Sequence, residues 1–191
     1  MAMASSPPPV RRDDHLLWVD LEMTGLDVQH DVILQAAAII TNADLQPLAE
    51  WSCDVWQPEA KLQQMTPYVR QMHEKTGLIE RVRRSLVADA EAEAQLLNFV
   101  SGWCCYKVPV CGNSVGQDKA FIDRYWPGVG RYLHYRVVDV STLKILAKRW
   151  YGESAVFEKS AVGEHDALVD IKNSIAELAH YRRKLFAAPG L

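Results

Sequence analysis

The sequence predicts an α/β fold in which a mixed five-stranded sheet is flanked by helices. The first observation is a series of three strand-like segments between residues 15 and 56, joined by short turns. Consecutive strands with short connections indicate an antiparallel meander. The second observation is that helical patterns alternate with two short strand-like segments from about residue 66 onward. That order adds two strands to the meander and places helices on the faces of the sheet.

Three segments form the predicted meander. Residues 15–22 (HLLWVDLE) are rich in strand-forming residues. Residues 32–41 (VILQAAAIIT) form a nearly continuous apolar run, which is typical of a central strand buried on both faces. Residues 48–56 (LAEWSCDVW) alternate apolar and polar side chains, as expected for a third strand.

Helix signals begin after the meander. Thr66 followed by Pro67 predicts a helix start, and Gly77 predicts its end. Asp89 opens another helix, because acidic residues in the first turn interact favourably with the helix dipole. Its apolar stripe comprises Leu96, Leu97, Val100 and Trp103.

The second half of the chain alternates strands and helices. We expect strands over 108–111 and 136–138, and helices over 118–125 and 141–150. A last helix runs from about Asp166 to Phe186, with an apolar face at heptad-like spacing. That face comprises Leu168, Ile171, Ile175 and Leu178.

The composition is that of a globular protein with near-neutral charge. The 191 residues contain 49% hydrophobic and 24% charged side chains, with a net charge of −3. These values exclude a disordered chain and a strongly basic DNA-coating protein. We expect a disordered lead-in over residues 1–14, which contain Ser-Ser-Pro-Pro-Pro, and a single domain over 15–191.

Processing signals and cysteines indicate a cytoplasmic protein. The chain has no apolar run long enough to cross a membrane, and its first residues lack the apolar core of a secretory signal. Cys53, Cys104, Cys105 and Cys111 include no C-x-x-C pair, so we expect reduced thiols rather than a zinc cluster.

Two carboxylates end the first predicted strand. Alternation places Leu17, Val19 and Leu21 on one face of that strand, and Asp20 and Glu22 on the other. Adjacent carboxylates repel each other and lose hydration when buried. A divalent cation between them would relieve both costs, whereas a solvent-facing strand end is the simpler alternative.

Further acids follow in two helical segments. Asp118 shares a helix face with Phe121, Ile122 and Tyr125, although it could also serve only the helix dipole. In the segment HDALVD, His165 and Asp170 are five residues apart and do not share one helix face. We expect His165 just before the helix, Asp166 or a neighbour as its cap, and Asp170 reaching the sheet.

Four acids and one histidine therefore occur in the order Asp, Glu, Asp, His, Asp. Oxygen ligands without cysteine or paired histidine favour Mg²⁺ or Mn²⁺ over Zn²⁺. Such a set suits phosphodiester hydrolysis by two metal ions. A lone histidine in this pattern is also compatible with a structural role.

Longer motifs give a specific resemblance over about residues 15–186. They are LLWVDLEMTGL, GNSVGQDKAFIDRY, LHYRVVDVSTLK and HDALVD. With them, the chain resembles the oligoribonuclease family, a branch of the DEDDh 3′→5′ exonucleases with an RNase H-like fold. The resemblance implies a 3′→5′ exoribonuclease that acts on very short RNAs, dinucleotides above all, and releases nucleoside 5′-monophosphates.

The resemblance also implies roles for the acidic residues. Asp20, Glu22, Asp118 and Asp170 match the family's metal ligands, which hold two Mg²⁺ or Mn²⁺ ions per site. Asp20 would bridge both ions, Glu22 and Asp170 would complete the first site, and Asp118 would hold the second. His165 matches the general base that takes a proton from the attacking water.

Other positions match the family's substrate contacts. Leu26 matches a residue that wedges between two bases, and Ser114, Arg136 and Ser141 match residues that cap the 5′ phosphate. A cap of this kind would exclude longer chains. Arg136 is also compatible with an ordinary surface arginine.

Two aromatic residues complete the implied site. Tyr135 matches a tyrosine that enters the partner subunit's site, so the resemblance implies a homodimer; a core or rim tyrosine is the alternative. The resemblance implies no stable partner of another kind, and the lack of a long apolar run predicts no association with a membrane. Tyr68 stands where the family often has tryptophan. Since tyrosine also stacks on bases, we expect it to keep that role.

Two other functions are compatible with parts of this pattern. A proofreading DNA exonuclease would use the same chemistry, but the chain lacks a basic stripe that could guide a long strand. A catalytically inactive binding module would have no physical need for four converging acids.

Overall fold

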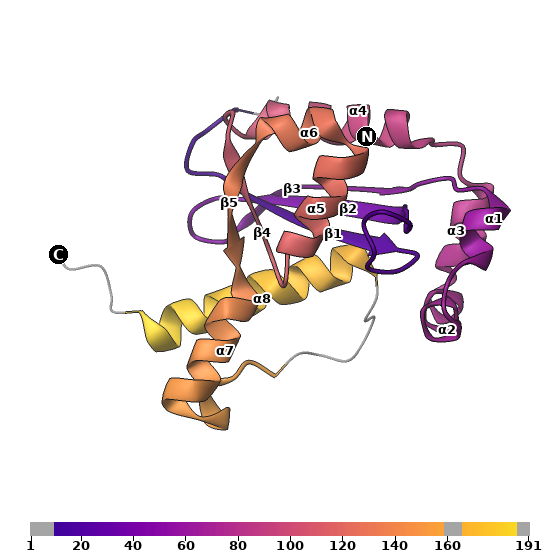
Figure 1. The fold of residues 1–191 in the computed structure, drawn as a ribbon. Coiled ribbons are helices and arrows are strands. Elements are labelled where there is room, and N and C mark those ends of the chain that lie inside the picture. The colour runs from indigo at the N-terminus through magenta and orange to yellow at the C-terminus, as the bar shows by residue number, and fades with distance from the viewer. Residues whose placement is uncertain (1–9, 159–165, 187–191) are drawn as a thin grey trace, which may run out of the picture.

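The computed structural model describes residues 10–158 and 166–186, and it contains a five-stranded sheet with helices on both faces (Figure 1). The strands are β1 (Leu16–Met23), β2 (Ile33–Thr41), β3 (Pro47–Asp54), β4 (Val108–Gly112) and β5 (Leu133–Asp139). The helices are α1 (Glu59–Gln63), α2 (Pro67–Lys75), α3 (Leu78–Arg84), α4 (Asp89–Trp103), α5 (Gly116–Tyr125), α6 (Pro127–Tyr132), α7 (Val140–Tyr151), the short 3-10 helix η1 (Glu153–Ala155) and α8 (Ala167–Leu185).

The sheet is mixed, with the strand order β3-β2-β1-β4-β5. β1 pairs antiparallel with β2, and β2 pairs antiparallel with β3, which confirms the predicted meander. β4 is parallel to both β1 and β5. β1 is therefore the central strand, and its last residues face helices from both halves of the chain.

The alternation of β1 divides its side chains between two hydrophobic layers. Leu17, Val19 and Leu21 pack with buried residues of α4, α5 and α6. Trp18 packs on the opposite face with buried residues of α7 and α8. All nine residues of β2 are buried, as its apolar run predicts. Burying apolar surface on both faces fixes the register of β1 and so the face on which Asp20 and Glu22 lie.

A third apolar cluster attaches α1, α2 and α3 to one end of the sheet (Figure 1). It contains Val32, Leu34, Leu62, Met65, Leu78, Ile79 and Val82. Thr66 caps α2 by accepting a hydrogen bond from the backbone N–H of Val69, and Pro67 opens the helix, as predicted. This cluster places α2 beside the end of β1.

Several elements differ from the sequence prediction. β1 begins one residue later than expected and β5 three residues earlier, at Leu133. Helices α1, α3 and α6 and the helix η1 were not predicted. They span only three to seven residues each, too few for a helical period to stand out. Helix α6 also contains a proline and two glycines, which by themselves indicate a turn.

Three further expectations concern the lead-in, the cysteine thiols and membrane-spanning helices. Within the predicted lead-in, Arg12 contacts the end of α4, because its backbone N–H donates to the carbonyl oxygen of Trp103 at 3.2 Å. The four cysteines are free thiols, and burial raises the pKa of Cys53 to about 11. None of the helices in the described residues has the length and apolar character needed to span a membrane.

Candidate active site

Three carboxylates converge between β1 and α8. Asp20 and Glu22 lie on the same face of β1, and Asp170 comes from the first turn of α8. Ligand oxygens of the three side chains all lie within 4.8 Å of one another. Glu22 is buried, and Asp20 and Asp170 are partly buried. This grouping agrees with the sequence expectation that Asp170 reaches the sheet.

The start of α8 is held in place by polar contacts. The Asp166 side chain caps the helix by accepting hydrogen bonds from the backbone N–H groups of Leu168 and Val169 at 3.2 and 3.3 Å. The backbone N–H of Ala167 donates to Gln35 Oε1 on β2 at 3.2 Å. Asp166 therefore occupies the capping position that the sequence predicts, and the cap fixes Asp170 one turn into the helix.

Asp118 reaches β1 from the opposite half of the fold. β1 pairs with β4 only at Leu17 and Trp18, so the later residues of β1 extend past the end of β4. Asp118 Oδ1 accepts a hydrogen bond from the backbone N–H of Leu21 at 2.9 Å and supplies the partner that a longer β4 would have provided. The carboxylate is 6% exposed.

Gly112 permits the close approach of β4 to β1 at this point. A Cβ atom on Gly112 would lie 3.0 Å from the carbonyl oxygen of Val19 and 3.1 Å from the Val115 side chain. A larger residue would push α5, and Asp118 with it, away from β1.

Burial and nearby negative charges favour the protonated forms of Glu22 and Asp118. Burial, and to a lesser extent the negative charges of Asp170, Asp118 and Asp166, together raise the pKa of Glu22 to about 8. Burial also raises the pKa of Asp118 to about 7, against the opposing effect of its hydrogen bond from Leu21. A cluster that resists ionisation without a counter-charge fits a divalent cation.

His73 is a site residue that sequence reasoning missed. It is fully buried on α2, with Nε2 2.9 Å from the carbonyl oxygen of Met23 and Nδ1 3.8 Å from Glu22 Oε2. A carbonyl oxygen can only accept, so Nε2 carries the proton. The Thr66-Pro67 start and the Gly77 stop place His73 near the end of α2 in the sequence, but only the packing of α2 shows that its ring faces β1.

The expected general base falls outside the part of the chain that the structure describes. His165 immediately precedes Asp166, the N-cap of α8. Its role stays a prediction from the sequence.

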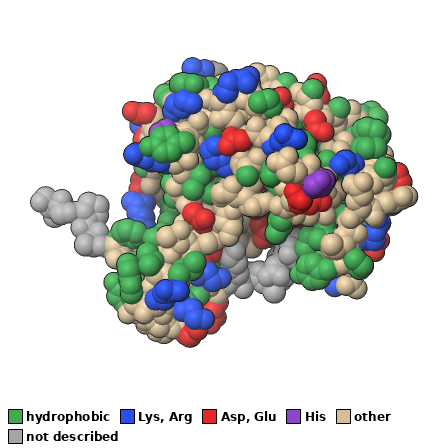
Figure 2. All heavy atoms as spheres, viewed as in Figure 1, with side chains coloured by type: hydrophobic (Ala, Val, Ile, Leu, Met, Phe, Trp, Pro, Cys, Tyr) green, Lys and Arg blue, Asp and Glu red, His purple; other side chains and the backbone are tan. Residues whose placement is uncertain are grey.

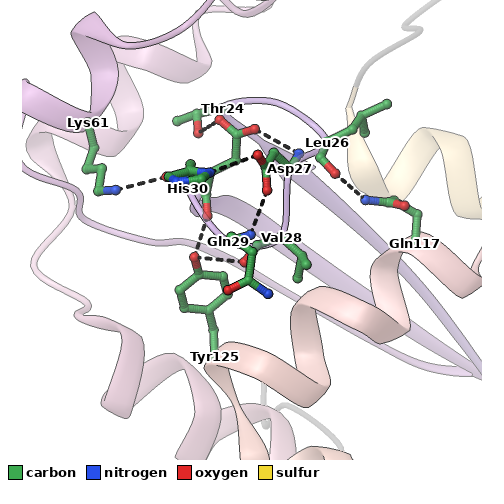
Figure 3. Close-up of polar contacts among 10 residues, drawn as sticks. Thr24, Leu26, Asp27, Val28, Gln29, His30, Lys61, Gln117 and Tyr125 are labelled. Atoms are coloured by element: carbon green, nitrogen blue, oxygen red, sulfur yellow. Dashed lines mark hydrogen bonds and ion pairs between the residues drawn. The ribbon is translucent and has the colours of Figure 1, made fainter.

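Leu26 lies on a loop held by several hydrogen bonds (Figure 3). Gln117 precedes Asp118 in α5, and its Nε2 donates to the carbonyl oxygen of Leu26 at 2.7 Å. The Asp31 carboxylate accepts from Thr24 Oγ1 at 2.8 Å and from the backbone N–H of Asp27 at 2.9 Å. The Leu26 side chain is 72% exposed, so the loop presents an apolar group to solvent beside the acidic cluster.

Ser114 and Ser141, predicted as parts of a phosphate cap, meet at the ends of β4 and β5. Their hydroxyl oxygens are 3.2 Å apart. The backbone N–H groups of both serines donate to Asp139 Oδ1, at 3.0 and 2.9 Å. Ser114 has a φ of 52°, a left-handed conformation that is uncommon outside glycine.

The other predicted substrate residues are exposed. Tyr135 and Arg136 are neighbours on β5, with the guanidinium 5.2 Å from the centre of the Tyr135 ring, and Tyr135 also stacks on His134. Tyr68 lies in the first turn of α2 and is 73% exposed. Thus Ser114 contacts Ser141 and Arg136 contacts Tyr135, whereas Tyr68 lies on a separate element, α2.

Comparisons with known proteins show the family to which this chain belongs. Residues 17–178 match the exonuclease family. Oligoribonuclease from Dichelobacter nodosus is 47% identical over 180 residues, which cover 93% of this chain and 98% of the relative. Oligoribonuclease from Azoarcus sp. is 47% identical over 173 residues, covering 88% and 93%.

Solved structures show the same fold at low sequence identity. One exonuclease I structure has a TM-score of 0.71 at 16% identity, covering 90% of this chain and 41% of the other. A zinc-bound complex of E. coli exonuclease I with single-stranded DNA has a TM-score of 0.69 at 18% identity, covering 91% and 41%. The expected RNase H-like fold is thereby confirmed. With a mixed sheet, converging acids and relatives of nearly equal length at 47% identity, the chain belongs to the oligoribonuclease family of exonucleases.

Proposed function

We propose that this exonuclease hydrolyses very short oligoribonucleotides, dinucleotides above all, from the 3′ end and releases nucleoside 5′-monophosphates. The observation that carries the proposal is the convergence of the Asp20, Glu22 and Asp170 carboxylates within 4.8 Å. Membership of the exonuclease family indicates the class of reaction, and the acidic cluster is the site where we expect that reaction to take place.

The donor set fits two Mg²⁺ or Mn²⁺ ions. Asp20, Glu22 and Asp170 would hold one ion, Asp20 would be shared, and Asp118 would hold the other. When bound, such ions stabilise negative charge on the attacking and leaving oxygens of a phosphodiester. The hydrogen bond from Leu21 to Asp118 Oδ1 leaves the other carboxylate oxygen of that residue to serve as a ligand.

The chain's own groups would orient the substrate and move the proton. Leu26 would separate two bases, Tyr68 would stack on one of them, and Ser114, Ser141 and Arg136 would cap a 5′ phosphate. Arginine suits that task because its guanidinium forms paired hydrogen bonds with phosphate oxygens. His165 would accept the proton of the attacking water.

A homodimer would complete the site through Tyr135. β5 is an edge strand, and Tyr135 on it is 73% exposed. Ile145, Trp150 and Tyr151 of α7 are more than half exposed, and Figure 2 shows hydrophobic side chains gathered over this helix at the lower left. Aromatic residues on an exposed edge are typical of a protein interface. The free thiols favour a reducing compartment such as the cytoplasm.

A product analysis with and without metal tests the proposal. The full chain is incubated with a 5′-phosphorylated diribonucleotide in Mn²⁺ or in chelator, and the products are separated by chromatography. We expect nucleoside 5′-monophosphates only with Mn²⁺. The same assay includes a single-stranded deoxyoligonucleotide, whose faster hydrolysis would favour a DNA exonuclease. Hydrolysis that persists in chelator would contradict the metal site.

A further inference from the structure

The cap serines are the outer end of a hydrogen-bonded series that begins at a buried carboxylate. Glu177, on α8, has an exposed fraction of 0%. Glu177 Oε2 accepts from Asn113 Nδ2 at 3.0 Å, and Asn113 Oδ1 accepts from Ser141 Oγ at 3.0 Å. Ser141 Oγ in turn accepts from the backbone N–H of Ser114 at 3.0 Å. We call Glu177, Asn113 and Ser141 the α8 relay.

The chemistry of the partners fixes the direction of the hydrogen bonds that Tyr181, Ser174 and Asn113 make around Glu177. The Tyr181 hydroxyl accepts from the backbone N–H of Phe157 at 3.4 Å and donates to Glu177 Oε1 at 3.1 Å. Ser174 donates its hydroxyl hydrogen to the carbonyl of Asp170 at 2.9 Å and accepts from Asn113 Nδ2 at 2.9 Å. Both hydrogens of the Asn113 amide are therefore used by atoms that accept, and the amide cannot flip without losing both bonds.

The orientation of the Asn113 amide determines whether the hydroxyl groups of Ser141 and Ser114 donate or accept. Because Asn113 presents its oxygen to Ser141, the Ser141 hydroxyl donates its hydrogen to Asn113 Oδ1. The Ser114 hydroxyl then donates to Ser141 Oγ at 3.2 Å and can turn outward to a ligand without breaking the rest of the series. The left-handed backbone of Ser114 holds that hydroxyl at an exposed position.

We propose that Glu177 is a positioning residue for 5′-phosphate recognition and acts through Asn113 and Ser141 to make the Ser114 hydroxyl a donor toward the phosphate. The inference rests on the proposed function, since it assumes that Ser114 and Ser141 cap a 5′ phosphate. Without an acceptor at residue 177, the Asn113 amide can present its nitrogen to Ser141. Three donors would then compete at Ser141 Oγ, and the Ser114 hydroxyl would lose its orientation.

The test compares kcat/KM for one diribonucleotide with a 5′ phosphate or a 5′ hydroxyl. The ratio of the two values measures the 5′-phosphate preference of the full-length protein. In Glu177→Ala we expect this ratio to fall about tenfold, the effect of one misplaced hydrogen bond to a charged group. The kcat/KM for the 5′-hydroxyl substrate should change less than about twofold. A general packing defect would lower both values together.

Two further variants separate positioning from stability. Glu177→Gln keeps a carbonyl oxygen that can accept from Asn113, so it should restore most of the preference. Tyr181→Phe removes the other hydrogen bond to Glu177 but leaves the α8 relay complete, so it should lower the melting temperature and keep the preference. If Glu177→Ala does not fold, Asn113→Ala breaks the relay nearer the cap, and we expect the same fall in the ratio.

The outcomes distinguish the inference from the proposed function. A wild-type preference that survives in a folded Glu177→Ala or Asn113→Ala protein would overturn the relay alone. A wild-type protein that hydrolyses both dinucleotides equally well would overturn the 5′-phosphate cap, and the relay with it.

Discussion

Asp118 has opposing effects on stability and on function. Its carboxylate accepts the hydrogen bond of Leu21, but burial raises its pKa to about 7, so its charge destabilises the metal-free fold above that pH. The folded protein binds a proton that the unfolded chain has released, and stability is therefore lost as the pH rises from about 4 through 7. Functional sites commonly carry such a cost.

Asp118→Asn separates these two effects. Asparagine keeps an oxygen for the Leu21 N–H and carries no charge, so we expect the metal-free variant to melt at a higher temperature than the wild type at pH 8. Hydrolysis should fall at least about a thousandfold, because a metal ligand is lost. Calorimetry and the dinucleotide assay check both effects. Undiminished turnover would remove Asp118 from the metal site.

The raised pKa of Glu22 gives a separate pH prediction. A cation must displace the proton that Glu22 holds below pH 8, so metal affinity rises with pH. We expect the increase in melting temperature caused by saturating Mg²⁺ to grow between pH 6 and pH 9. An increase of equal size across that range would mean that the cation binds away from Glu22.

At the scale of elements, the Leu26 loop depends on Gly25. A Cβ atom there would collide with the Asp31 carboxylate that ties the loop together. We expect Gly25→Ala to raise the KM for a diribonucleotide several-fold, since Leu26 would be displaced. Gly128→Ala is the matched control, because its Cβ on α6 would lie 2.9 Å from Glu93 Oε1 of α4 and not against the Asp31 carboxylate. A KM that rises equally in both variants would indicate a general defect.

The elements that could be predicted from the sequence are those with a strong periodic pattern or a clear helix-start signal. The apolar run of β2, the alternation of β1 and the Thr66-Pro67 start of α2 all appear in the structure. Short helices such as α3 were not predicted, because their helical structure depends on packing against the sheet rather than on a sequence pattern of their own.

The candidate site was predictable in its residues and less so in its geometry. The acids could be named from their motifs, but the bond between Leu21 and Asp118 joins residues 97 positions apart. His73 contacts Met23 across 50 positions. Such contacts follow from the order of the strands and from helix packing, and a lone histidine in a helix carries no local signal of its target.

At the scale of the whole molecule, the charge of the chain agrees with a small binding site. Without Asp20, Glu22, Asp118 and Asp170, the remaining 20 acidic residues face 21 basic ones. The mild acidity of the protein is thus no larger than the charge of the proposed metal site. We expect short RNA to be held by metals and a small cap rather than along a basic groove.

The proposed dimer can be tested by complementation. Tyr135→Ala and Asp118→Asn should each be inactive as homodimers. In a heterodimer, the protomer with an intact Asp118 receives an intact Tyr135 from its partner. Co-expression in equal amounts should therefore restore about one quarter of the wild-type activity. No recovery, with heterodimers verified by mass spectrometry, would show that Tyr135 does not act across the interface.

The most direct measurement of the central claim is a length series. The kcat/KM of the wild-type protein is measured with Mn²⁺ for 5′-phosphorylated RNAs of two to seven nucleotides. The 5′-phosphate cap predicts that the dinucleotide is hydrolysed at least about tenfold faster than every longer RNA, because a continuing strand would collide with Ser114 and Ser141. Equal values along the series would contradict an enzyme built for the shortest RNAs.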